Sequence, residues 1–159
     1  MKTKAVTSGL LAVAAAVASA PVASAEVTAT KYPYIDYRTF AKRWETPNGR
    51  TVTCTINTIL TVQSPTKVIT GAKSRCSTTI PYPPRLAVSV RRNTETVFND
   101  TRVMSLFPEN GTLTWGTSFG PSYDIAAARY QVSAVILDPA GRWELFGNSE
   151  VVKTSASVK

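Results

Sequence analysis

After residue 25, the chain alternates apolar and polar side chains with a period of two. The clearest apolar series is Val52, Cys54, Ile56, Leu60 and Val62, and mostly threonine and asparagine stand between its members. Successive side chains of a β-strand point to opposite faces, so this alternation predicts a strand with one buried and one exposed face. Helical periodicity is nearly absent from the same region. The alternation therefore predicts an all-β fold.

Turn signals separate the alternating runs at intervals of roughly ten residues. They are Asn48-Gly49, residues 64–67, Asn110-Gly111 and residues 138–141. Short strands joined in this way are typical of an antiparallel sandwich or barrel. We also expect short β runs at residues 97–98 and 103–107, on either side of Asn99-Asp100. Residues 125–128 are expected to form at most one helical turn.

Two cysteines, Cys54 and Cys76, stand 22 residues apart on either side of the predicted turn at residues 64–67. If this hairpin folds symmetrically about Pro65, residues whose numbers sum to 130 face each other, and the two cysteines meet that condition. An oxidising compartment then favours a disulfide between them. A bulge at Gly71 would shift the register by one residue. Two free thiols or an intermolecular bridge are the alternatives.

The first 25 residues have the pattern of a secretory signal peptide. Lys2 and Lys4 precede an apolar run over residues 9–18, and Ala23-Ser24-Ala25 supplies small residues for cleavage before Glu26. The apolar run is too short to span a bilayer as a mature helix, and no later segment is longer. The pattern therefore predicts a secreted protein whose mature chain has no membrane span.

The mature chain would be a single β-sandwich domain, residues 26–159. Without Lys2 and Lys4, 16 basic side chains stand against 10 acidic ones, a net charge of +6. An excess of this size favours anionic partners such as acidic glycans. Solubility alone is the other explanation, because the basic residues are scattered along the sequence. No nucleic-acid-binding motif is present, so nucleic acid is not an expected partner.

Residues 125–134 resemble the corner between strands E and F of immunoglobulin-like and fibronectin-III-like sandwiches. In that pattern an aliphatic residue precedes a tyrosine by five positions, as Ile125 precedes Tyr130. The resemblance implies that the Tyr130 ring packs in the core and that its hydroxyl bonds to upstream backbone. Residues 52–56 also look like an immunoglobulin-type strand B. Val132 stands where antibody domains carry their second cysteine, and the resemblance implies a fold but no activity.

The composition disfavours most enzyme classes. The chain has no histidine, which removes Ser–His and Cys–His pairs and the usual zinc sites. No calcium loop, nucleotide-binding loop or nucleophile-elbow motif is present. Two carboxylates would suffice for a glycosidase, so a small hydrolase of that kind is the remaining enzymatic alternative. We expect no catalytic residues, no metal and no cofactor.

Two segments are candidate ligand-binding surfaces. The first covers residues 31–38, with Tyr32, Tyr34, Tyr37 and Arg38, and is followed by Phe40, Lys42, Arg43 and Trp44. Its aromatic rings and cations could stack on sugars or on a protein. The second contributes Tyr82 and Arg85 from a proline-rich, extended element. The simpler explanations are a first strand packed on the sandwich and a plain connection between sheets. Trp115 and Trp143 fall on strand-like runs and are expected in the core.

These observations favour a secreted, non-catalytic binding or adhesion module for an extracellular protein or an anionic cell-envelope glycan. The alternative is a secreted hydrolase inhibitor that presents a rigid loop. In that case residues 81–85 or 138–142 would carry Arg85 or Arg142 into an acidic specificity pocket.

Overall fold

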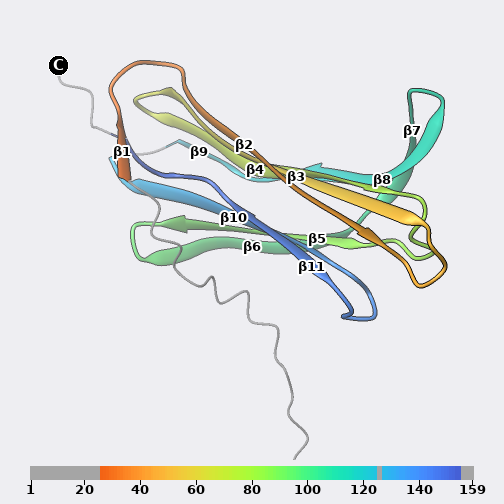
Figure 1. Ribbon diagram of the computed structural model, residues 1–159. Helices are drawn as coiled ribbons and strands as arrows, with labels where there is room; N and C mark the ends of the chain where they lie inside the picture. Colours follow the sequence, from red (N-terminus) through yellow and green to blue (C-terminus); the bar gives the residue numbers. More distant parts are fainter. Residues whose placement is uncertain (1–25, 125–126, 155–159) are drawn as a thin grey trace, which may run out of the picture.

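The chain folds into two facing β-sheets (Figure 1). The computed structural model describes residues 26–124 and 127–154, and in these ranges the regular structure consists of strands with no helix. The predicted signal peptide and its cleavage site, residues 1–25, lie outside the described residues, as do residues 125–126 of the expected helical turn. The strands are β1 (Glu26–Ala29), β2 (Tyr34–Glu45), β3 (Thr51–Ser64), β4 (Lys67–Ser77), β5 (Arg85–Arg92), β6 (Glu95–Val103), β7 (Ser105–Glu109), β8 (Thr112–Phe119), β9 (Ser122–Asp124), β10 (Arg129–Leu137), β11 (Glu144–Asn148) and β12 (Val151–Thr154).

Antiparallel pairing dominates both sheets. In the first, which we call the β10 sheet, the strands follow the order β1-β12-β10-β5-β6, and β11 also pairs with β10. In the second, the β3 sheet, the order is β2-β3-β4-β8-β7, and β9 pairs with β4. Only β1 and β12 run parallel among these described pairs, with Glu26 opposite Val151 and Ala29 opposite Thr154. The prediction of an all-β, two-sheet, antiparallel-rich fold is confirmed.

The β3–β4 hairpin has the predicted register. Cys54 lies opposite Cys76 and the two form a disulfide, so the bridge joins neighbouring strands of one sheet. The register stays constant from this pair to Val62 opposite Val68. The alternative of a bulge at Gly71 does not occur in this pairing, and the irregularity falls between Val62 and Ser64, next to the turn.

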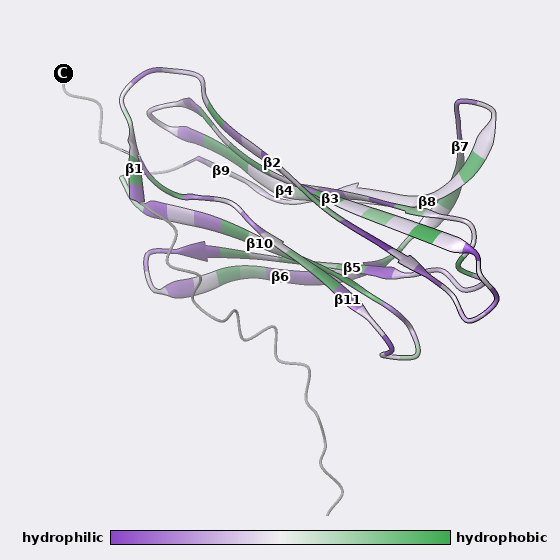
Figure 2. Cartoon of the chain, in the orientation of Figure 1, coloured by the Kyte–Doolittle hydropathy of each residue, from purple (hydrophilic) through white to green (hydrophobic). Residues whose placement is uncertain are grey.

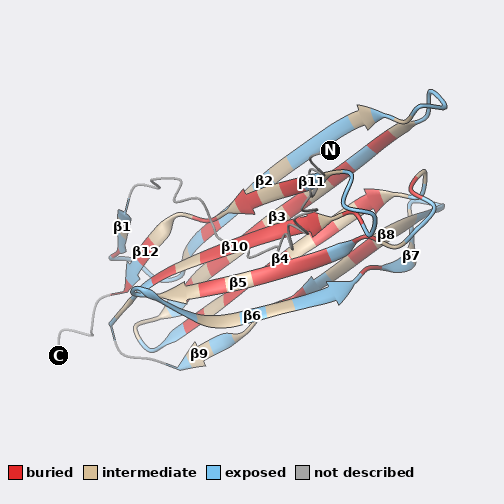
Figure 3. Cartoon of the chain, turned by 90° about the horizontal axis from the view of Figure 1, so that it is seen from below, coloured by how far each residue is buried: buried red, intermediate tan, exposed pale blue. Residues whose placement is uncertain are grey.

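The core lies between the sheets and follows the two-residue alternation. Figure 2 shows hydrophobic and hydrophilic bands alternating along the strands, and Figure 3 shows the buried bands concentrated on β3, β4, β5 and β10. Every second residue of β3 is buried from Val52 to Val62, as predicted. The largest fully buried side chains are Tyr130, Ile56, Leu60, Leu86, Met104, Ile136, Val52, Val62, Val68, Val88, Val90 and Val132.

The expectation for residues 97–107 is partly wrong. Asn99-Asp100 do not separate two short β runs, because β6 continues through them from Glu95 to Val103. β6 is an edge strand, and the Asp100 carboxylate accepts hydrogen bonds from the Thr101 amide at 2.9 Å and from Arg102 Nε at 3.0 Å. The Asp100 carboxylate is therefore satisfied within the strand. The turn before β6 lies at Asn93, which has a φ of 56°. Asparagine tolerates this left-handed conformation better than most residues do.

β4 pairs with two strands in succession, β8 and then β9. The exchange occurs at Gly120, where an added Cβ would lie 2.2 Å from the Thr70 carbonyl oxygen and the Gly71 Cα. The Thr70 amide and hydroxyl both donate to the Pro121 carbonyl oxygen, at 3.0 and 2.7 Å. Because neither Gly71 nor Gly120 has a Cβ, the backbone of β4 and the β8–β9 connection approach closely at this point. β4 pairs with β9 on one side of it and with β8 on the other.

Candidate functional site

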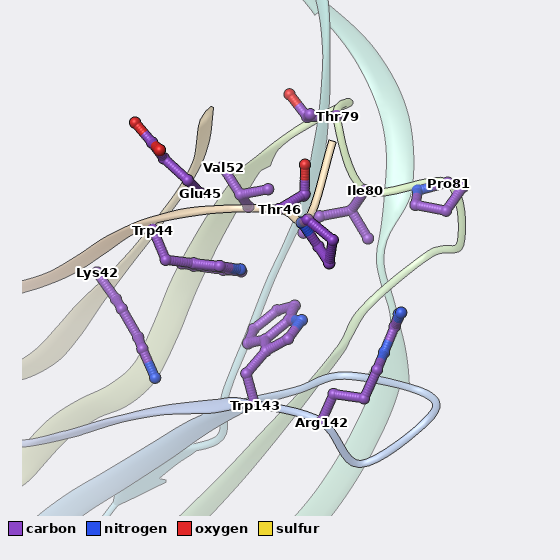
Figure 4. A pocket seen from close by; sticks show the side chains of 11 residues that line it. Lys42, Trp44, Glu45, Thr46, Val52, Thr79, Ile80, Pro81, Arg142 and Trp143 are labelled. Carbon is purple, nitrogen blue, oxygen red and sulfur yellow. The ribbon is translucent and has the colours of Figure 1, made fainter. Parts of the chain in front are cut away.

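A pocket of about 420 Å³ opens at the end of the sandwich where the β2–β3 hairpin, the β4–β5 connection and the β10–β11 turn meet (Figure 4). This volume lies within the range of small-molecule sites. The pocket is lined by Lys42, Trp44, Glu45, Thr46, Pro47, Val52, Thr79, Ile80, Pro81, Arg142 and Trp143. It therefore combines apolar walls with cations, a carboxylate and two hydroxyls.

Two tryptophans from opposite sheets meet in this pocket. Trp44 comes from β2 and Trp143 directly precedes β11; their ring centroids are 4.6 Å apart and their planes are tilted by 48°. Both rings are half-buried and pack against the hydrophobic core. The expectation that Trp143 belongs to the core is thus correct for one part of its surface, while another part lines the pocket.

Lys42 stands beside the tryptophan pair. Its Nζ lies 5.8 Å from the centroid of the Trp44 ring and donates a hydrogen bond to the Glu144 carbonyl oxygen at 3.3 Å. This contact holds the ammonium group against the aromatic face and connects edge strand β2 to β11 of the opposite sheet. A ligand in the pocket would meet a cation and an aromatic surface together.

Local turn chemistry shapes the pocket on the β2–β3 side. The Gly49 amide donates to the Thr46 carbonyl oxygen at 2.9 Å, and Gly49 has a φ of 74° that glycine adopts without strain. The Thr46 amide donates to the Arg50 carbonyl oxygen at 2.8 Å. The predicted Asn48-Gly49 turn is confirmed, and it fixes Thr46 and Pro47 in the pocket wall.

On the opposite side, Asp138 organises the β10–β11 turn. Its buried carboxylate accepts hydrogen bonds from the Arg142 amide at 3.1 Å, from Nε at 2.8 Å and from a terminal guanidinium nitrogen at 3.3 Å. The Gly141 amide donates to the Asp138 carbonyl oxygen at 2.9 Å. These bonds, led by that from the Arg142 side chain, lower the pKa of Asp138. The turn that carries Trp143 is therefore held by a charged contact between the buried Asp138 carboxylate and the exposed Arg142 side chain.

Asp138→Asn is expected to lower the free energy of unfolding at pH 7, because the buried Asp138 carboxylate loses its charge-assisted hydrogen bonds to the amide and the exposed side chain of Arg142. The pKa of Asp138 is lower in the folded state, so its stabilisation is complete above the unfolded pKa of about 3.9 and is lost as the pH falls further. Urea unfolding of both proteins at pH 7, 5 and 3 measures this. The difference should shrink at pH 3, and an unchanged difference would contradict the assignment.

The end of the molecule that holds the pocket carries cations without ion-pair partners. Within the described residues, Lys42, Arg43 and Arg50 form no salt bridge, whereas Arg142 is paired with Asp138. All three lie on or beside the β2–β3 hairpin, which we call the cationic hairpin. Glu45 stands among them, so the hairpin keeps a positive balance next to the pocket.

The tyrosine-rich part of the first candidate segment, residues 31–38, lies at the end of β2 away from the pocket. Tyr34 and Arg38 point toward the opposite sheet, where the Tyr34 hydroxyl donates to Glu150 Oε2 at 2.9 Å and Arg38 pairs with both Glu150 and Asp36. The Glu150 amide donates to Asp36 Oδ2 at 2.7 Å. Burial and the bond to Glu150 raise the pKa of Tyr34 to about 12. These two side chains connect β2 with the segment between β11 and β12.

The remaining candidates divide between the two ends. Tyr32 precedes β2 and is exposed, and Tyr37 is 55% exposed on the outer face of the β3 sheet. Tyr82 and Arg85 lie instead on the pocket side, since Tyr82 follows the pocket residue Pro81 and is 60% exposed. Ten residues of strand separate Tyr34 from Trp44, about 34 Å, so the structure does not unite the six candidates in one site.

Sequence reasoning included Trp44 and Lys42 in the first candidate segment, but it did not pair Trp44 with Trp143. A usable signal was present, since each tryptophan lies within four residues of a predicted turn, Asn48-Gly49 or residues 138–141. Hairpin ends on one side of a sandwich cluster in space. What the sequence did not reveal was that these two turns lie at the same end.

Over residues 26–124 and 127–154, no helix has the length and apolar character needed to cross a membrane. The same described ranges contain no cluster of three or more metal-ligating side chains. Comparison of the chain with protein-family models, with curated proteins and with solved structures finds no match.

Proposed function

We propose that this protein is a secreted, non-catalytic binding module with an immunoglobulin-like fold, and that it binds an acidic glycan of the cell envelope through the Trp44–Trp143 pocket. The observation that carries the proposal is the tilted tryptophan pair, open to the pocket and flanked by Lys42 and Arg142. The Cys54–Cys76 disulfide supports an extracellular location, because such bridges persist in oxidising compartments.

The strand order supports the immunoglobulin-like part of the proposal. With β3, β4, β8 and β7 taken as strands A, B, E and D, the β3 sheet has the order A-B-E-D. With β5, β6 and β10 taken as C, C′ and F, and β11 and β12 as G, the β10 sheet has the order G-F-C-C′. Tyr130 then lies at the start of strand F, as the corner motif requires. This assignment makes β4 strand B, whereas the resemblance in the sequence pointed to residues 52–56 of β3.

The chemistry of the pocket suits a sugar ring with a negative charge. The C–H face of a pyranose packs on aromatic surface, and hydroxyl groups need donors and acceptors of the kind that Glu45, Thr46 and Thr79 present. A carboxylate on the sugar would find Lys42 in the wall and the cationic hairpin close by. Because these positive charges are exposed, binding of an acidic sugar should weaken as the salt concentration rises.

Trp143→Ala is expected to weaken binding to acidic polysaccharide roughly thirtyfold, because a buried aromatic anchor is lost. Binding of the secreted protein to polygalacturonate and hyaluronan, measured by isothermal titration at low and high salt, tests this. The neutral polymer laminarin is the reference. Arg43→Gln with Arg50→Gln should weaken binding at low salt and have little effect at high salt.

The matched controls lie at the opposite end of the molecule. Tyr37→Ala removes an exposed aromatic ring, and Lys67→Gln with Lys153→Gln removes the same charge as the arginine variants. Thermal unfolding confirms that each variant is folded. Equal losses from Trp143→Ala and Tyr37→Ala would argue against the pocket as the binding site, and no retention on either acidic polymer would reject the glycan.

A hydrolase inhibitor is the second candidate function, and one observation favours it. The segment that carries Tyr82 is anchored at both ends, by a hydrogen bond from Trp115 Nε1 to the Ile80 carbonyl oxygen at 3.0 Å and from the Met104 amide to the Pro84 carbonyl oxygen at 2.8 Å. A loop held in this way loses little entropy on binding. Unchanged rates of trypsin-like, subtilisin-like and amylase enzymes at micromolar protein would reject this function.

A further inference from the structure

The β7–β8 hairpin extends away from the body of the sandwich and carries exposed leucines. Figure 1 shows its tip bending away at the end of the molecule opposite β1. Leu106 in β7 is 47% exposed and Leu113 in β8 is 56% exposed. Leucines on a strand are normally placed toward a core, so their exposure here needs an explanation.

The strand register shows that these leucines belong to the inner face of the β3 sheet. Leu106 lies opposite Trp115, Trp115 opposite Cys76, and Cys76 opposite Cys54. Both cysteines are buried in the core, and residues paired across a sheet share a face. Leu106 therefore continues the core face beyond the reach of the β10 sheet.

Leu113 and its partner Pro108 share this face, because each lies two residues from the Leu106–Trp115 pair. The opposite face of the hairpin is occupied differently. On that face the Arg75 guanidinium lies over the Phe107 ring, 5.6 Å from its centroid, and Arg75 forms an ion pair with Glu109. We call the inner-face residues Leu106, Pro108 and Leu113 the apolar overhang.

The overhang is connected to the pocket wall through Trp115. Trp115, the cross-strand neighbour of Leu106, donates its Nε1 hydrogen to the carbonyl oxygen of Ile80, and Ile80 lines the pocket wall. This chain of contacts leads from the pocket wall to the strand pair that carries the overhang. The two surfaces differ in chemistry, since the pocket presents aromatic, charged and hydroxyl groups and the overhang presents aliphatic side chains and a proline.

We propose that the ligand is an amphiphile: an acidic sugar that enters the pocket and carries an alkyl or acyl chain that lies on the overhang. This inference rests on the proposed function and specifies its ligand class. Aliphatic side chains suit a hydrocarbon chain, which needs no hydrogen-bond partner. A peptide that paired with β7 as a further strand would find one backbone donor of β7 missing, because Pro108 has no amide hydrogen. The cationic hairpin complements the charge of the head group.

The test compares octyl β-D-glucuronide, below its critical micelle concentration, with methyl β-D-glucuronide. The octyl compound is expected to bind about tenfold or more tightly, because several methylenes leave water. Leu106→Ser with Leu113→Ser should remove this gain and leave the affinity for the methyl compound unchanged. Both leucines are exposed, so folding is retained, and Ile35→Ser on exposed β2 is the matched control.

The outcomes separate this inference from the proposed function. Equal affinity for the two glucuronides, with Trp143→Ala still weakening both, overturns the amphiphile and leaves the pocket assignment intact. A gain that survives in the double leucine variant also overturns it. Failure of both compounds to bind overturns the amphiphile, and if neither acidic polymer is retained it overturns the proposed function as well. Capture of an extracellular protein that depends on the leucines, without any effect of the alkyl chain, would make the overhang a protein-docking face instead.

Discussion

Removal of the Cys54–Cys76 bridge is expected to lower the free energy of unfolding by about 3 kcal/mol, the chain-entropy estimate for a loop of this size. The two cysteines are 22 residues apart and both are buried in the core. Without the bridge, the unfolded chain has more accessible conformations, so its conformational entropy is higher and unfolding is more favourable. Chemical unfolding of the wild type and of a double variant, Cys54→Ala with Cys76→Ala, measures the loss.

The register of the hairpin provides the control for this experiment. Cys54 and Cys76 lie opposite each other in a ladder that continues to Val62, so β3 and β4 are expected to remain paired in the variant. Circular dichroism should therefore keep its β signature at low denaturant. Equal stability of the oxidised and double-alanine proteins would show that the bridge does not constrain the unfolded chain in this way.

Tyr130→Ala should cost about 3–5 kcal/mol, because the largest fully buried side chain of the core would be replaced by a cavity. Its ring packs against that of Tyr123, with centroids 5.8 Å apart. Thermal and urea unfolding measure the loss. Ile136→Val, a smaller truncation at another fully buried position of β10, provides the reference and should cost about 0.5–1.5 kcal/mol.

Tyr130→Phe separates the packing of the ring from the role of its hydroxyl. Within the described residues no partner meets hydrogen-bond geometry at this hydroxyl, and the Arg92 guanidinium lies close to it; burial raises the pKa of Tyr130, and Arg92 opposes the rise. Removing a buried, unpaired hydroxyl should be neutral or stabilising. The corner motif implies a bond to upstream backbone, and residues 125–126 lie outside the described part of the chain. A loss of about 1 kcal/mol in Tyr130→Phe would therefore favour the corner bond and contradict the unpaired hydroxyl.

Local pattern was sufficient to predict the all-β class, the buried face of β3 and one contact between cysteines 22 residues apart. The alternation from Val52 to Val62 identified the buried face of β3, and the symmetry about Pro65 identified the partner of Cys54. Both depend on neighbours in sequence. The continuation of β6 through Asn99-Asp100 could not be read in this way, because it depends on the position of β6 at the edge of a sheet, where Asp100 bonds to its own strand.

The candidate site depends even more on tertiary structure. Tyr34 and Arg38 looked available for a ligand in the sequence, yet both are engaged with Glu150, which is more than a hundred residues away. Trp44 and Trp143 meet for the same reason, since the pocket forms where connections from both sheets converge. Composition indicates which residue types suit a ligand, while the topology decides which of them remain free.

The parallel pairing of β1 with β12 has a mechanical consequence. Tension applied through Glu26 and Thr154 would pull the two strands past each other along their length, so that the hydrogen bonds of the ladder are loaded together in shear. A ladder peeled from one end breaks its bonds one after another and yields at lower force. The pocket lies at the end of the sandwich away from β1 and β12. A stretched molecule would therefore keep its binding site until the hydrogen bonds between β1 and β12 break.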